Sequence, residues 1–178
     1  MVMSPRLRKL ALMAHVTSSV GWLGAVASFL VLAVAGLSSG NAQIVRGAYV
    51  VMSVIAWWII VPACFASLIT GLVSSLGTPW GVFRQYWVLL KLLMTVPAII
   101  LLLVHMWPID YIAGVAAGTT LANVDLHGLR VQLIIEAGAA MLVLLVATAL
   151  SVYKPKGMTR YGWRKQHEER ALSRSEAT

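Results

Sequence analysis

Acidic residues and cysteine are scarce in this chain. Of its 178 residues only six are aspartate or glutamate, and charged residues make up 11% of the total. In ordinary soluble domains about a quarter of the residues are charged, so this composition excludes a water-soluble protein. The single cysteine, Cys64, excludes an intrachain disulfide and a cysteine-based metal cluster. The sequence also has no phosphate-binding glycine loop and no motif of a nucleophile triad, so a soluble type of enzyme has no support and enzymatic activity stays open.

Hydrophobic residues make up 60% of the chain and are arranged in long runs. Each run exceeds the roughly 20 residues that a helix needs to cross about 30 Å of hydrocarbon. In a bilayer the backbone must satisfy its hydrogen bonds within the segment, so helices are the expected structure. We predict an all-α, integral membrane four-helix bundle that forms a single domain over residues 1–178. The predicted helices cover residues 10–37, 48–76, 82–106 and 131–153.

The positions of the basic residues predict how the helices are oriented across the membrane. The formal net charge is +8, and the lysines and arginines flank the apolar runs. They lie before the first run, at the start of the third, and along a basic tail over residues 154–178. Because positively charged flanks stay on the cytoplasmic side, we predict that the N- and C-termini are both cytoplasmic. The first run is much longer than the roughly 7 to 15 residues of a signal-peptide core, so it is expected to stay as a helix.

The pattern as a whole is typical of a multi-pass protein of the bacterial inner (cytoplasmic) membrane. Its expected partner is the lipid bilayer, whose anionic head groups the flanking basic residues can contact. A homo-oligomer and a membrane redox partner are open as further partners, and nucleic acid is not expected. The longest connection is predicted over residues 107–129, with Asp125 as the N-cap of the last helix.

Ionisable side chains inside the predicted helices are the candidates for function. A charge in hydrocarbon is costly, so such residues are usually retained for a role. Helix rise places His15 and Lys91 toward the cytoplasmic side, and His105 and Glu136 toward the outer side. The sequence therefore predicts an inner and an outer polar site.

The inner site begins with a polar stripe on the first helix. His15, Ser18, Ser19 and Trp22 follow helical spacing and share one face. His15 could bind a cofactor or only form hydrogen bonds within the bundle. Lys91 could reach the cytoplasmic head groups, or could hold a ligand, a substrate carboxylate or a haem propionate.

The outer site centres on Glu136, which shares a helix face with Gln132. His105 and His127 are its closest partners by depth. Imidazole and carboxylate together suit several transition metals, and they equally suit a proton relay or plain interhelical hydrogen bonding. Trp57 and Trp58 lie near mid-membrane, where they could line a cavity for a flat cofactor or quinone, or simply pack in the core.

One motif resembles a known family. The stretch SLGTPWG at residues 75–81 is followed by Arg84, Tyr86, Trp87, Lys91 and His105. This pattern resembles small four-helix bacterial membrane proteins of unknown function, over nearly the whole chain. A histidine often precedes the tyrosine in that family, whereas this chain has Gln85, so a ligand role there is absent or replaced.

A more distant likeness concerns cofactors. His15, with Trp22 and Gly24 after it, is similar to the first helix of CopD-type and HemJ-type membrane proteins. Trp87, Lys91 and Leu92 are similar to a HemJ helix. HemJ proteins are b-haem-containing protoporphyrinogen oxidases, and the resemblance implies His15 and Lys91 as residues of a haem site. CopD proteins are linked to copper handling.

Three functional hypotheses follow. In the first, the protein is an oxidoreductase-like membrane protein that binds haem b through His15, with Lys91 as the opposite ligand or propionate anchor and Trp22 and Arg84 nearby. In the second, it handles or transports copper or another metal through His105, His127 and Glu136. In the third, it is a structural membrane subunit without a cofactor.

Overall fold

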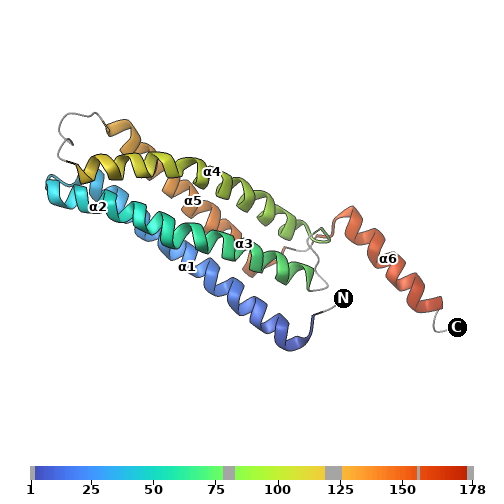
Figure 1. Ribbon diagram of the computed structural model, residues 1–178. Helices are drawn as coiled ribbons and strands as arrows, with labels where there is room; N and C mark the ends of the chain where they lie inside the picture. The colour runs from blue at the N-terminus through green and yellow to red at the C-terminus, as the bar shows by residue number, and fades with distance from the viewer. Residues whose placement is uncertain (1–2, 78–82, 119–125, 156, 176–178) are drawn as a thin grey trace.

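The computed structural model describes residues 3–77, 83–118, 126–155 and 157–175 (Figure 1). Within these residues the chain is helical and contains no strand, apart from one isolated β-bridge between Gln85 and Met158. The elements in order are α1 (Pro5–Ser38), α2 (Ala42–Ile55), the π-helix η1 (Ala56–Ile60), α3 (Val61–Leu76), α4 (Tyr86–Ala117), α5 (His127–Tyr153) and α6 (Arg160–Ser175).

Four of the helical spans are long and apolar enough to cross a membrane, which confirms the predicted all-α architecture. They are Pro5–Ser38, Ala42–Leu76, Tyr86–Ala117 and His127–Tyr153. α1 packs against α2, α3 and α5, while α4 packs mainly against α2 and α5. The N-terminus and α6 lie at the same end of the bundle (Figure 1).

The observed third span is longer than the sequence predicts. α4 runs from Tyr86 to Ala117 and passes through both Pro97 and Pro108, so residues 107–117 of the outer loop expected over 107–129 are helical. A proline removes one backbone N–H but does not prevent a helix whose neighbours support it. Asp125, the predicted N-cap of the last helix, lies outside the described residues.

The second span changes its winding in the middle. In η1 the N–H of Val61 donates to the Ala56 carbonyl, five residues earlier, immediately before Pro62. Such single π-turns absorb one extra residue in an otherwise α-helical segment. Trp57 and Trp58 are 45% and 78% exposed, so they neither line a closed cavity nor pack in the core, and both predicted alternatives are wrong.

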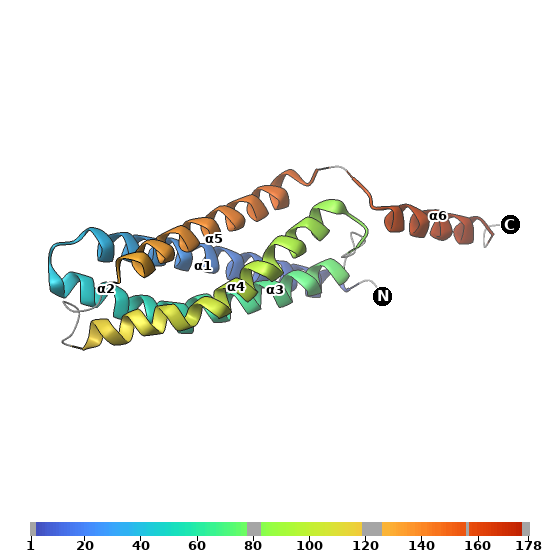
Figure 2. The same cartoon turned by 90° about the horizontal axis from the view of Figure 1, so that it is seen from above.

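The basic tail contains a helix that is tied to the start of α4. Thr159 donates its backbone N–H to the Arg84 carbonyl at 3.0 Å and its hydroxyl to the Phe83 carbonyl at 2.5 Å. The Thr159 hydroxyl also accepts the N–H of Gly162 and so caps α6. Two views show α6 extending away from the end of the bundle (Figures 1 and 2).

Candidate functional site

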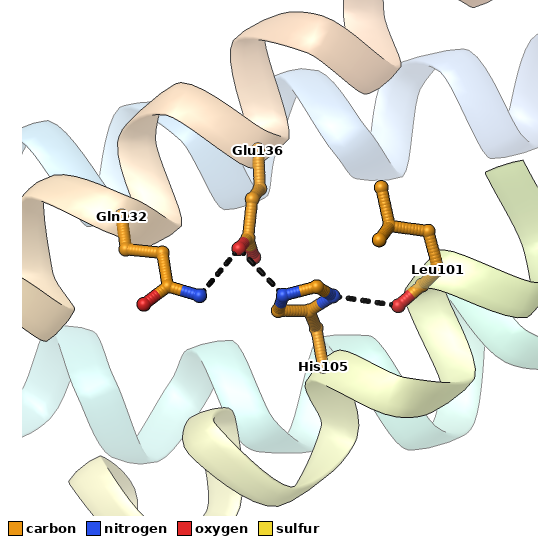
Figure 3. A network of polar contacts seen from close by, with 4 residues as sticks. All are labelled: Leu101, His105, Gln132 and Glu136. Carbon is orange, nitrogen blue, oxygen red and sulfur yellow. Dashed lines mark hydrogen bonds and ion pairs between the residues drawn. The ribbon is translucent and has the colours of Figure 1, made fainter.

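His105 on α4 and Glu136 on α5 face each other across the bundle (Figure 3). Nε2 of His105 lies 2.7 Å from Oε1 of Glu136, and Nδ1 lies 2.7 Å from the Leu101 carbonyl oxygen one turn earlier. Gln132 donates its side-chain N–H to the same Oε1 at 2.7 Å. The structure therefore brings together two residues of the predicted outer site, with Gln132 as a third member.

The geometry fixes how many protons this pair holds. The Leu101 carbonyl can only accept, so the Nδ1 of His105 must carry a hydrogen. At 2.7 Å the Nε2 of His105 and the Oε1 of Glu136 must then share one further proton. Whether that proton lies on the imidazole or on the carboxyl, the pair is neutral overall. A neutral pair is the form that a low-dielectric environment tolerates best.

An apolar cavity of about 280 Å³ adjoins the pair. Its walls come from α1, η1, α4 and α5, and His105 and Glu136 are the only titratable groups among the described residues that line it. The lining residues are Trp22, Val26, Phe29, Ile60, Met94, Pro97, Ala98, Leu101, Leu102, His105, Ile109, Leu133, Glu136, Ala137, Ala139, Ala140, Val143 and Leu144. The cavity is the main functional feature that the sequence analysis did not predict.

Several of the side chains in the cavity wall are small. α5 contributes alanines at 137, 139 and 140, and α4 contributes Pro97 and Ala98. The sequence signal was the run of small residues from Ala137 to Ala140. On its own, such a run equally predicts close helix packing.

The cavity opens toward the outside of the bundle between α4 and α5. Pro97 and Leu101 of α4 and Ala139 of α5 line it and are also exposed on the bundle surface. In a membrane this surface faces lipid chains. An apolar molecule can therefore enter from the bilayer without crossing water.

His127, the third residue of the predicted metal set, is not part of this group. It begins α5 and lies about 13 Å along the helix axis from Glu136. No group of three or more His, Cys, Asp or Glu side chains in the described part of the chain could hold a metal ion. The pair supplies at most two such ligands.

The two residues of the predicted inner site, His15 and Lys91, form their hydrogen bonds to different helices. His15 packs against α3, where its Nδ1 lies 3.1 Å from the Ser67 carbonyl and 3.3 Å from the Thr70 hydroxyl. The hydroxyls of Ser19 and Ser67 are 2.7 Å apart, so the predicted polar stripe on the first helix forms a seam with α3. A Cβ at Gly71 would lie 3.0 Å from the imidazole, which shows that this glycine makes room for His15.

Lys91 connects α4 to α5 through a hydrogen bond. Its Nζ donates to the Ser151 hydroxyl at 3.0 Å and lies 4.6 Å from the centre of the Trp87 ring. Trp22 lines the cavity beside the His105–Glu136 pair, and the backbone of Arg84 takes part in the attachment of α6. His15, Lys91 and Arg84 are not among the residues that line this cavity.

Comparison of the chain with known protein families, with curated proteins and with solved structures finds no match.

Proposed function

We propose that this protein binds a membrane-soluble, largely apolar molecule in the cavity between α1, α4 and α5. The polar group of that molecule would meet the His105–Glu136 pair. The observation that carries the proposal is an apolar cavity that opens toward lipid and has one neutral pair of titratable side chains in its wall. Ligand sites commonly combine apolar walls with a few convergent polar groups.

The pair suits a ligand that carries oxygen. Among the described residues, the Oε2 of Glu136 has no hydrogen-bond partner and is available to a ligand. Because the shared proton can move between His105 and Glu136, the pair can act as a donor or an acceptor without changing its net charge. That property supports binding of a carbonyl or hydroxyl group at this point.

The proposal includes an orientation in the bacterial inner membrane. Lys91 and Asp110 lie about 28 Å apart along α4, close to the hydrocarbon thickness of a bilayer. With the basic end of the bundle in the cytoplasm, His105 and Glu136 would lie just below the outer head groups. A ligand would then reach them from the outer leaflet.

A substitution that fills the cavity tests the proposal. The protein in lipid nanodiscs is titrated with a decyl-substituted benzoquinone and binding is followed by calorimetry. Ala140→Leu places a larger side chain in the cavity and should abolish binding, whereas Ala149→Leu on the exposed side of the same helix should not change it. Equal binding by both variants, or no binding by the unmodified protein, would contradict the proposal.

A b-type haem at His15 is the second candidate. Hydrogen-bonding of Nδ1 to the Ser67 carbonyl leaves Nε2 with a lone pair, the form in which a histidine binds a metal. Lys91 is already engaged by Ser151, so it would have to leave this partner to act at the haem. A reduced b-type absorption band that is lost in His15→Ala would support this candidate, and colourless protein after expression with ample haem would refute it.

A further inference from the structure

Trp22 has an unused hydrogen-bond donor at the cavity. Its side chain is 5% exposed and lines the cavity from α1. Among the described residues no hydrogen bond reaches its indole N–H, and this nitrogen is not one of the fully buried unpaired atoms. The N–H is therefore accessible and can donate to a ligand that carries an acceptor, as indole N–H groups commonly do.

The cavity wall therefore offers polar groups from three different helices. Trp22 contributes a donor from α1, and His105 and Glu136 contribute an exchangeable proton from α4 and α5. The remaining lining residues are apolar, and Phe29 lies two helical turns after Trp22 on α1.

The volume limits the size of what is held. About 280 Å³ is just below the volumes of ligand pockets, which span roughly 300 to 1,000 Å³. The cavity is thus suited to a single substituted ring, and a hydrocarbon tail can leave through the opening between α4 and α5.

We infer that the ligand is a single-ring molecule with two oxygen substituents, of the quinone class, held at both oxygens. One carbonyl accepts the N–H of Trp22, and the other meets the His105–Glu136 pair. This inference rests on the proposed function, since it identifies the class of molecule that the cavity takes. It concerns binding alone and includes no electron transfer.

The test compares two probes on the protein in lipid nanodiscs. One is a decyl-substituted benzoquinone, and the other is decylbenzene, which has the same tail and ring but no oxygen. The unmodified protein should bind the quinone at least 10-fold more tightly. Trp22→Phe keeps an aromatic ring and removes the donor, so it should weaken quinone binding about 5- to 10-fold and leave decylbenzene unaffected.

Trp58→Phe is the matched control, because Trp58 is 78% exposed on the outside of the bundle and lies outside the cavity lining. Equal affinity of the unmodified protein for both probes would overturn the quinone inference and leave the apolar cavity proposal standing. Binding of neither probe would overturn the proposed function itself. The comparison of probes needs no substitution, so the inference stays testable even if Trp22→Phe unfolds.

Discussion

Lys91 and His105 lie on the same helix, and each bonds to α5 on either side of the cavity. Lys91 donates to Ser151, and His105 shares a proton with Glu136. The two residues are about 21 Å apart along α4, and the α4 residues that line the cavity between them are Met94, Pro97, Ala98, Leu101 and Leu102. α4 and α5 are thus held by polar contacts above and below an apolar gap.

The His105–Glu136 pair should show strong coupling in a double-mutant cycle. His105→Gln and Glu136→Gln each leave the partner without its shared proton, and each should destabilise the protein by about 1–2 kcal/mol. The double variant should lose clearly less than the sum of the two. The measurement is unfolding in mixed detergent micelles, and additive losses would mean that the contact contributes no coupling.

Gly36 should be intolerant of any side chain. A Cβ at this position would lie 2.7 Å from Cζ of the buried Tyr49 ring, so α1 and α2 could not approach as closely. We expect Gly36→Ala to lower the thermal midpoint by several degrees, as overpacking in a well-packed core costs roughly 1–3 kcal/mol.

The matched control is Gly24→Ala on the same helix, where an added Cβ would meet nothing within 4 Å. This variant should be neutral or slightly stabilising, because alanine favours the helix over glycine. Equal thermal midpoints for the two variants would show that the contact between Gly36 and Tyr49 is not restrictive.

The attachment of α6 should depend on Thr159. Its hydroxyl bonds the Phe83 carbonyl and caps α6 through the Gly162 N–H, and Thr159→Val removes both contacts while preserving shape. We expect faster hydrogen exchange in the first turn of α6 and earlier proteolysis of the tail. Exchange in α1 serves as the internal reference and should not change.

The orientation is tested with cysteines placed at the two ends of the bundle. In a Cys64→Ala background, Gly40→Cys lies in an exposed position between α1 and α2, and Ser175→Cys lies at the end of α6. A membrane-impermeant maleimide added to whole spheroplasts should label the first and should label the second only after permeabilisation. The reverse pattern would invert the proposed orientation.

The sequence predicted the four spans because their length and hydropathy depend on local composition alone. It also predicted that His105 and Glu136 are close, because the rise per residue of a helix gives the depth of each side chain in the membrane. It could not predict that His15 bonds to α3, because the relative rotation of two helices depends on packing across the whole bundle. The length of α4 was underestimated because residues 107–129 were predicted to form a loop, whereas residues 107–117 continue the helix through Pro108.

The cavity was missed for a related reason. A void arises where small side chains on separate helices meet, here Pro97 on α4 and Ala140 on α5, and their meeting is set by tertiary packing. Trp22 was singled out for its spacing from His15, yet the structure places it with the outer pair. Helical periodicity correctly placed His15 and Trp22 on one face of α1. It could not predict that His15 contacts α3 while Trp22 lines the cavity.

The π-turn at Ala56–Ile60 takes up one extra residue in the middle of the second span. Deleting one residue there should restore regular α-helical winding and leave α2 and α3 in their present orientation. Ser67 and Thr70 would still face His15, and Asp110 would still accept the Ser53 hydroxyl on the other side of the turn. The extra residue thus offsets the sequence periodicity of α3 from that of α2 by one position, although the two halves form one continuous span.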